Sequence, residues 1–489
     1  MEVNSTLHMV TQLNPDALFI AAELDSQRTA GIVRGPLHGI PVLLKNNIAT
    51  ADKMDNSAGS YALAGAKVSR DSTVAAKLRQ AGAIILGKTN LSQWANYRSF
   101  NTSNGWSAIG GQAQGAYYPG QDPSGSSSGS GVASSLGLAL AALGTETSGS
   151  ILSPASANNL VGIKPTVGLT SRDLVIPISE HQDTVGPMAR TVMDAAYILT
   201  AIAGKSPYDN YTNAIPFDSI PNYVAACNFS ALRGKRIGVP RNLIDLSSDA
   251  SAAPIVPVFE IALDIMRAAG ATIVDNTNFT GYDALKNGNY SSVVLETDFI
   301  TDLPMYLSHL SSNPNNVHSV EDVRNFTHYF PLEDWPERDT LIWDEGLGLG
   351  FDNTSPEFWS NYTMNTYLAG LLGVTGALAN YSLDALVIPT KFSPSFPAAI
   401  GAPVITVPLG SYPSDTKILM NQFGNLNTTA PNIPFGISFL GPHFSEELLI
   451  GLAYSFEQRS LVRNTIMPYI RPSTELVDIV NAKREPTGT

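Results

Sequence analysis

Short apolar runs alternate with amphipathic segments along the first third of the chain. Residues 39–44 (GIPVLL) and 83–86 (AIIL) are expected to form short buried strands, and residues 72–81 (STVAAKLRQA) an amphipathic helix. Residues 15–30 carry apolar side chains at helical spacing and are also expected to be helical. Strands that alternate with helices are typical of α/β layer folds, so the sequence predicts that class.

Helices and strands are also expected further along the chain. The small apolar residues of 131–143 predict a helix packed inside the protein, and residues 445–460 predict a long helix that closes the core. The segment 208–380 is rich in Asn, Tyr and Trp, and we expect it to be a helical, loop-rich elaboration that covers one side of the sheet. Further strands are expected at residues 235–239, 271–274, 386–388, 404–407 and 436–439.

The composition limits the classes of function. The formal net charge of the 489-residue chain is −13, and an acidic surface disfavours nucleic acid and anionic membranes as partners. Cys227 is the single cysteine, which excludes intrachain disulfides and zinc sites built on several thiolates. No apolar run approaches the length that spans a bilayer. We therefore expect neither nucleic acid as a partner nor a membrane span.

The start of the chain and its sequons leave two localisations open. Residues 1–10 (MEVNSTLHMV) lack the basic region and the apolar stretch of a signal peptide. Asn-x-Ser/Thr sequons are nevertheless frequent, which either reflects an Asn-rich composition or marks a secreted glycoprotein whose leader is absent here; otherwise the protein is expected to be cytoplasmic. The sequons begin at Asn4, Asn90, Asn101, Asn210, Asn228, Asn278, Asn289, Asn325, Asn353, Asn361, Asn380 and Asn427.

Two short motifs match known patterns in an unsuitable context. Residues 82–89 (GAIILGKT) match the phosphate-loop pattern, but their apolar centre is expected to be the strand itself rather than the loop after it. Residues 125–129 (GSSSG) match the nucleophile-elbow pattern, but turn-forming residues instead of a buried strand precede them. An elbow enzyme also needs a histidine, and each downstream histidine is expected at the surface or in a satisfied hydrogen bond. These histidines are His181, His309, His318, His328 and His443.

A longer combination of segments is more specific. A lysine ends an apolar strand in GPLHGIPVLLKNNI, and it is followed by the Ser/Gly run GSSSGSG, by GTETSGSI, by Pro154-Ala155 and by VGIKPT. These segments resemble the signature of the amidase signature family. The resemblance extends to GKTNLSQWANYR, GWSAIGGQ, DTVGPMART, GAPVITVPLG and PFGISFLG, and it covers nearly the whole chain. Within the family, the chain looks most like the peptide amidases and their fungal relatives.

The resemblance implies a fold and a domain organisation. The family fold is α/β, with a mixed central β-sheet covered by helices on both faces. The chain shows neither an internal repeat nor a flexible linker, so we expect one amidase domain over residues 1–489, with a signature core at about residues 35–195. Most members have a further helical stretch ahead of the segment that matches residues 2–10, and this chain is expected to begin inside that helix.

The family hydrolyses amides with a Ser–Ser–Lys triad, and the motifs transfer these roles by position. The nucleophile is the last serine of GTETSGS, Ser150, the bridging serine on a cis peptide is Ser126, and the base is Lys45. The implied reaction is acyl transfer in two steps through an acyl-enzyme, and it requires neither a metal nor a cofactor. The backbone N–H groups around Thr147 to Ser150, namely those of Thr147, Ser148, Gly149 and Ser150, are expected to form the oxyanion hole.

The residues around the lysine suit a neutral base. A lysine accepts a proton only when its amine is uncharged, and its reference pKa is about 10.4. Burial lowers that pKa, because it disfavours the ammonium form. The apolar residues 40–44 are expected to lead Lys45 into the core. Relatives often carry Asp directly after this lysine, whereas here Asn46 adds no charge that would hold the lysine protonated.

The substrate is expected to be a small-molecule or peptide amide, such as a C-terminal peptide amide or an aryl or alkyl carboxamide. Ala95, Gly125 and Ser126 are expected to contact it, and the pocket is expected to be lined from Trp94-Ala95 and from residues 208–380. Two departures from the family pattern are Ser148 in place of a glycine and Leu152 in place of an arginine.

Other functions stay open. An acyltransferase or ester hydrolase would use the same triad, and only the acceptor or the bond cleaved would differ. The subunit that feeds ammonia to tRNA-bound Glu is disfavoured by the lack of a basic patch. A non-enzymatic binding protein has no use for a buried neutral lysine. The oligomeric state is expected to be a monomer or a homodimer.

Overall fold

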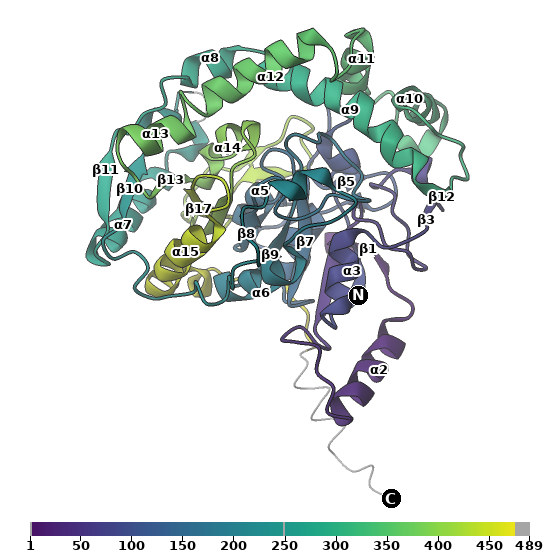
Figure 1. The fold of residues 1–489 in the computed structure, drawn as a ribbon, viewed down its shortest axis with the longest axis horizontal. Helices are drawn as coiled ribbons and strands as arrows, with labels where there is room; N and C mark the ends of the chain where they lie inside the picture. Colours follow the sequence, from purple (N-terminus) through teal and green to yellow (C-terminus); the bar gives the residue numbers. More distant parts are fainter. Residues whose placement is uncertain (1, 248–249, 475–489) are drawn as a thin grey trace, which may run out of the picture.

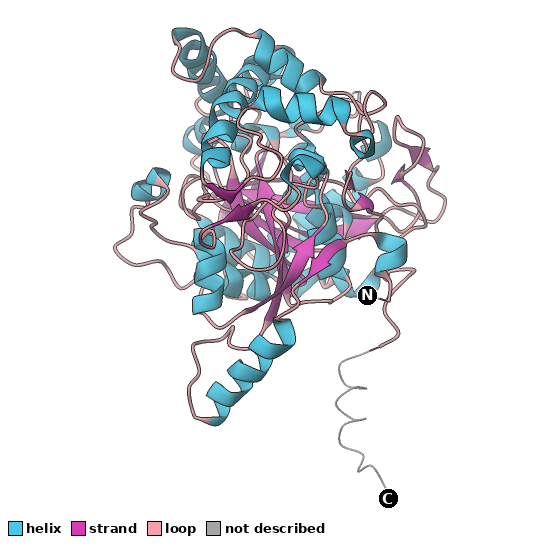
Figure 2. Ribbon diagram, turned by 90° about the vertical axis from the view of Figure 1, so that its right-hand side faces the viewer, coloured by secondary structure: helices cyan, strands magenta, loops and turns pink. Residues whose placement is uncertain are grey.

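The computed structural model describes residues 2–247 and 250–474, and its centre is a mixed sheet of 11 strands (Figures 1 and 2). In spatial order these strands are β1 (Val10–Leu13), β4 (Ile84–Thr89), β2 (Pro41–Lys45), β7 (Ala141–Glu146), β9 (Thr184–Ala189), β8 (Val161–Lys164), β14 (Val404–Ser411), β17 (Pro434–Leu440), β13 (Ala385–Pro389), β10 (Arg236–Val239) and β11 (Thr272–Asp275). Strand β2 runs parallel to β4 and β7, and β10 runs parallel to β13 and β11, whereas the other pairs are antiparallel. The predicted α/β class with a mixed sheet is confirmed.

Helices cover both faces of the sheet because alternate residues of each strand point to opposite sides. In β2, Val42 and Leu44 pack into one core with α3 (Thr73–Gln80), α6 (Val192–Ile202), α7 (Ile255–Ala268) and α15 (Glu446–Ser460). Leu43, between them, packs on the opposite face with Val132 of α4 (Ser128–Ser135). Helix α5 (Leu152–Ala157) lies on this second face beside β8, β14 and β17.

A run of helices forms an arc along one side of the molecule (Figure 1). It comprises α8 (Tyr282–Asn287), α9 (Tyr290–Ser308), α10 (Val320–Tyr329), α11 (Leu341–Gly348), α12 (Pro356–Ala369) and α13 (Val374–Asn380). Phe299 of α9 and Trp343 of α11 pack in a separate core with Trp94 from the N-terminal third of the chain. The arc is therefore anchored to the part of the chain that carries the signature motifs.

The remaining elements are the 13-residue helix α2 and a set of shorter segments. They are α1 (Asn4–Leu7), α2 (Ala17–Thr29), α14 (Ser395–Ala399), β3 (Lys67–Val68), β5 (Trp106–Ser107), β6 (Gly111–Gln112), β12 (Leu310–Ser312), β15 (Leu419–Met420), β16 (Asn427–Thr429) and the 3₁₀ turns Tyr61–Leu63, Gln93–Asn96, Asn210–Ala214, Arg241–Leu243, Ala250–Ala252, Pro331–Glu333, Thr390–Phe392 and Val462–Thr465. Across the described ranges 2–247 and 250–474, no helix combines the length and the apolar character of a membrane-crossing segment.

The prediction of one helix over residues 131–143 is wrong in its second half. Helix α4 ends at Ser135, and Gly137 then adopts a φ of 71°, a left-handed conformation that commonly ends helices. The apolar residues from Ala141 onward form β7, in the middle of the sheet. Small apolar residues suit a tightly packed helix and a strand buried on both faces equally well, so the pattern alone did not separate them.

Candidate active site

Lys45 ends strand β2 and its side chain is fully buried. Its Nζ lies within hydrogen-bond distance of three oxygens: Ser126 Oγ at 2.8 Å, Thr145 Oγ1 at 2.9 Å and the Thr145 carbonyl at 3.3 Å. The parallel pairing of β2 with β7 brings Lys45 and Thr145 to the same end of the two strands. None of these three partners is a carboxylate. The contacts are therefore compatible with an uncharged amine.

Burial lowers the pKa of Lys45 to about 7, although Asp183 and Glu146 act in the opposite direction from further away. The next residue, Asn46, is also buried, and its Oδ1 accepts hydrogen bonds from the backbone N–H and the hydroxyl of Ser57. An amide at this position leaves the amine of Lys45 without a neighbouring negative charge. With this pKa, a substantial fraction of the amine is neutral at neutral pH and can accept a proton.

Ser126 lies in the loop that precedes helix α4, and its side chain is buried. The peptide bond between Gly125 and Ser126 is cis, as the resemblance implies. A Cβ added to Gly125 would lie 2.5 Å from Ser92 Oγ and 2.9 Å from Asn104 Oδ1. A larger residue at this position would therefore have to displace the side chains of Ser92 and Asn104.

Ser150 lies in the turn between β7 and α5 and is buried. The N–H of Ser127 donates to the Ser150 carbonyl at 3.1 Å, which joins the two serine loops. The hydroxyls of Ser126 and Ser150, both within the described part of the chain, do not hydrogen-bond to each other. The structure thus joins Lys45 to Ser126 through side chains, and the Ser126 loop to Ser150 through the backbone.

A buried glutamate shapes the turn that carries Ser150. The Glu146 carboxylate accepts the N–H groups of Gly149 at 2.8 Å, Ile151 at 2.7 Å and Leu152 at 2.9 Å. Burial raises the pKa of Glu146 above its ordinary value. The Lys164 charge and these hydrogen bonds act in the opposite direction and offset part of the rise. Sequence reasoning did not single out Glu146, although it is the one acidic residue in GTETSGS.

The same contacts bear on the expected oxyanion donors. The N–H of Gly149 is already donated to Glu146. The N–H groups of Thr147, Ser148 and Ser150 have no acceptor among residues 2–247 and 250–474. Three of the four expected donors are therefore available to a ligand, and the fourth holds the turn.

Asp183 ties the neighbouring strand to this turn. Its carboxylate accepts the Thr147 hydroxyl at 2.5 Å and the N–H groups of Ile178 at 2.7 Å and Ser179 at 3.1 Å. Burial raises the pKa of Asp183 above its ordinary value, and these hydrogen bonds offset part of the rise. Its position in DTVGPMART was part of the family resemblance, but its bond to Thr147 was not foreseen.

A cavity of about 430 Å³ opens beside the serine turn. Ser148, two residues before Ser150, and Gln182 line one wall of this cavity. The other walls come from residues 243–295, as expected for the elaboration, and from residues 391–396. These lining residues are Leu243, Tyr282, Leu285, Lys286, Ser291, Leu295, Lys391, Phe392, Pro394, Ser395 and Phe396.

Trp94 and Ala95 were expected to line the substrate pocket, but they are not part of the wall of this cavity. Both residues are buried in the 3₁₀ turn Gln93–Asn96 with positive φ, and Trp94 packs edge-on against Trp343. Neither lines the 430 Å³ cavity. The turn nevertheless supports the site, because the Ser92 N–H donates to the Ser126 carbonyl at 3.0 Å.

A second cavity of about 280 Å³ is lined by Ser124 and Ser153, which are close in sequence to Ser126 and Ser150. Its wall also contains Asp122, whose pKa is raised to about 6 by burial. Asp122 accepts hydrogen bonds from Asn104 and from the Ser124 N–H. This cavity flanks the loop of Ser126 through Ser124.

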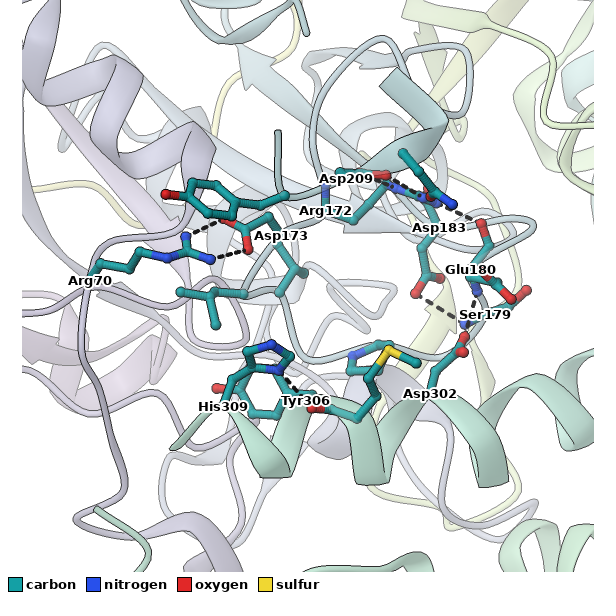
Figure 3. A pocket seen from close by; sticks show the side chains of 16 residues that line it. Arg70, Arg172, Asp173, Ser179, Glu180, Asp183, Asp209, Asp302, Tyr306 and His309 are labelled. Carbon is teal, nitrogen blue, oxygen red and sulfur yellow. Dashed lines mark hydrogen bonds and ion pairs between the residues drawn. The ribbon is translucent and has the colours of Figure 1, made fainter. Parts of the chain in front are cut away.

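A third cavity of about 250 Å³ is walled by charged side chains (Figure 3). The Arg70–Asp173 pair lies at one end, while Asp183 and Asp302 lie toward the other. Burial and neighbouring carboxylates raise the pKa of Asp302 to about 8. The cavity holds no part of the Lys45–Ser126 pair, and we assign it no chemistry.

One side-chain cluster has the composition of a metal site. Ligand atoms of Glu180, His181 and Asp298 lie within 4.8 Å of one another. Asn353 Nδ2 donates to Glu180 Oε1 at 3.3 Å and to Asp298 Oδ1 at 3.1 Å. An amide donor directed at both carboxylates disfavours a cation between them.

Comparisons with known proteins show which proteins the chain resembles. A family model described as Amidase matches residues 1–304. A protein of Arthroderma benhamiae named "Putative amidase" is 55% identical over 98% of this chain and 80% of its own length, and a "Probable amidase" of Arabidopsis thaliana is 38% identical over 94% and 85%. The crystal structure of native peptide amidase from Stenotrophomonas maltophilia superimposes with a TM-score of 0.85 and 38% identity, covering 96% of this chain and 93% of that one.

Proposed function

The chain belongs to the amidase family and is an amide hydrolase, and we propose that Lys45, Ser126 and Ser150 carry out the hydrolysis. The observation that supports this most directly is the 2.8 Å hydrogen bond between Lys45 Nζ and Ser126 Oγ inside a buried site. A lysine whose pKa is lowered to about 7 can act as a base at neutral pH. Ser126 then links that base to a second serine.

The first half-reaction forms an acyl-enzyme. Ser150 Oγ attacks the carbonyl carbon of the amide and gives its proton to Ser126 Oγ, while the Ser126 proton moves to the neutral amine of Lys45. The tetrahedral intermediate collapses as the C–N bond breaks. The proton held by Lys45 returns through Ser126 to the leaving amine.

The second half-reaction releases the acid. Water attacks the acyl-enzyme carbonyl and passes a proton to Lys45 through Ser126. The ester bond to Ser150 breaks, and the proton returns to Ser150 Oγ. In both halves the oxyanion accepts hydrogen bonds from N–H groups of the turn Thr147 to Ser150, and one such donor stabilises the transition state by roughly 3 kcal/mol.

The cavity beside Ser148 is the proposed site of the acyl group. Its volume of about 430 Å³ and its aromatic and leucine side chains suit a large apolar group. Together with the likeness to a peptide amidase, this supports C-terminal peptide amides and aryl or alkyl carboxamides as substrates. Gly125 and Ser126 are proposed to lie against the substrate from the side of the second cavity.

Two measurements test the triad. A fluorophosphonate probe should label the wild type and fail to label Ser150→Ala, which should also lose turnover of a primary carboxamide such as benzamide. Ser308→Ala, at an exposed serine of α9 outside the site, serves as the matched control and should still be labelled. Labelling that persists in Ser150→Ala would falsify the assignment of the nucleophile.

Product analysis in the turnover assay separates hydrolysis from acyl transfer. An acyltransferase would pass the acyl group to an added amine, and an ester hydrolase would turn over the matching ester faster than the amide. We expect the free acid as the product with and without added amine. Accumulation of the acylated amine would favour the transferase instead.

We also propose that the exposed sequons carry N-linked glycans. Exposed acceptors are Asn101, Asn210, Asn228, Asn278, Asn289, Asn325 and Asn380, and several lie on or near the helical arc. By contrast Asn90 and Asn353 are buried and unsuited to modification. Treatment of the protein from its own cells with peptide N-glycosidase should increase its electrophoretic mobility, and unchanged mobility would contradict the proposal.

A further inference from the structure

Gln182 lies across the sheet ladder from the turn that carries Ser150. Strands β7 and β9 pair with Thr145 opposite Val185 and Glu146 opposite Thr184. Continued by one residue, this register brings Thr147 opposite Asp183, and the two are joined by a hydrogen bond. Continued once more, it brings Ser148 opposite Gln182, and both line the 430 Å³ cavity.

The backbone around Gln182 is firmly held. The N–H groups of Gln182 and Asp183 both donate to the Ser179 carbonyl, at 3.3 Å and 2.9 Å. The Asp183 carboxylate accepts two N–H groups from the same turn. The side chain of Gln182 therefore extends from a rigid turn, which is the condition for a binding group that is already in position before a ligand arrives.

The amide nitrogen of Gln182 has no partner. The residue is 2% exposed, and its Nε2 has no hydrogen-bond acceptor within the described ranges. Buried amide donors are nearly always paired in folded proteins, and each exception calls for an explanation. Nε2 is closed off from solvent as the side chain lies here, and a half-turn of the terminal amide, which exchanges its nitrogen and oxygen, would present it to an acceptor that a ligand brings into the adjoining cavity.

The rest of this cavity indicates what kind of ligand would carry that acceptor. Tyr282, Phe392 and Phe396 contribute aromatic rings, and none of the lining residues is acidic. An aromatic or large apolar group fits such walls. The polar groups Ser148 and Gln182 lie at the wall that continues into the catalytic turn, so the acceptor is expected close to the scissile amide.

We propose that Gln182 Nε2 donates a hydrogen bond to the carbonyl that precedes the scissile amide in a peptide-like substrate. The enzyme then selects amides of N-acylated aromatic or large apolar amino acids over carboxamides that lack this carbonyl. The inference rests on the proposed function, because it takes Ser150 as the point at which the scissile carbonyl is held. It makes Gln182 a residue that determines substrate preference.

Two substrates that differ in the relevant group test this. N-acetylphenylalaninamide and 3-phenylpropanamide share the phenyl ring and the primary carboxamide, and only the first has the preceding carbonyl. The ratio of their kcat/KM values should favour the acetylated substrate in the wild type. In Gln182→Leu and Gln182→Glu, neither of which offers the amide donor, the ratio should fall about tenfold, as expected when one hydrogen bond to the substrate is lost.

Controls separate recognition from a structural role. Gln80→Leu, at an exposed glutamine that ends α3, should keep the wild-type ratio. Because Nε2 has no partner in the free protein, Gln182→Leu should not lower Tm, whereas a structural glutamine would lower Tm and reduce kcat on both substrates alike. An unchanged ratio in Gln182→Leu overturns the role of Gln182 and leaves the amidase proposal intact. A wild type that hydrolyses neither amide overturns the proposed function itself.

Discussion

Lys45 Nζ lies 2.8 Å from Ser126 Oγ, and neither side chain reaches solvent. The pair comes from segments 81 residues apart in the chain, and the sheet holds one partner while a glycine-bounded loop holds the other. A proton can therefore pass between them without any rearrangement. In the proposed mechanism, the hydroxyl of Ser150 has to approach that pair when a substrate binds.

The activity should depend on pH through Lys45. The amine must be neutral to accept a proton, and burial lowers its pKa to about 7. Below that pH the ammonium form dominates, so kcat/KM should fall about tenfold for each further pH unit, and above it the value should level off. The profile of a neutral amide substrate measures this, and a limb near the ordinary lysine pKa would contradict a buried base.

Replacing Glu146 should harm both stability and catalysis. Its two carboxylate oxygens accept three backbone N–H groups, whereas a glutamine offers one acceptor oxygen. Glu146→Gln should therefore leave at least one buried donor unpaired, at a cost of about 1–3 kcal/mol, and should lower kcat because the Ser150 turn loosens. Thermal unfolding and steady-state kinetics measure both effects, with Glu23→Gln at an exposed position of α2 as the control.

Two glycines with the same backbone conformation allow strain to be separated from function. Gly149 has a φ of 83° and Gly31 a φ of 81°, so alanine at either position costs about 1–2 kcal/mol. A Cβ on Gly31 meets open space, whereas one on Gly149, next to the proposed nucleophile in the chain, would lie 3.0 Å from Ser153 Oγ. Both variants should lose similar stability in a denaturant titration, but only Gly149→Ala should lose most of its kcat. Equal activities would show that the turn tolerates the added methyl.

The whole chain should unfold as one unit. Strands β10 and β11 come from within the elaboration yet extend the same sheet as the signature strands. We therefore propose a single domain and expect one calorimetric transition, because neither part can keep its side of the sheet without the other. Two separate transitions would contradict this.

Several elements could be predicted from local sequence alone. Branched apolar runs such as residues 84–86 and 404–407 identified strands that the structure contains. Strands β8 and β9 were not expected as strands, because Gly162, Gly186 and Pro187 interrupt their pattern. These residues are tolerated because pairing on both sides fixes the strands in the middle of the sheet, which no local pattern reports.

The site shows the same division. Lys45, Ser126 and Ser150 could be proposed as site residues because the combination of motifs that resembles the family contains a counterpart for each of them. Glu146 and Gln182 could not, since their importance depends on which N–H groups or cavity walls the finished fold brings beside them. A glutamate in a serine-rich run is as easily a surface residue until the turn closes around it.

The cavity beside Ser148 draws most of its walls from the helical arc and the 391–396 segment, whereas the proposed reacting groups belong to the sheet and its loops. Under the proposed function, most residues that shape the acyl site therefore belong to other stretches of the chain than the reacting groups, and Ser148 and Gln182 are the exceptions. Directed evolution confined to the arc could retune which amides are accepted without disturbing the proton relay.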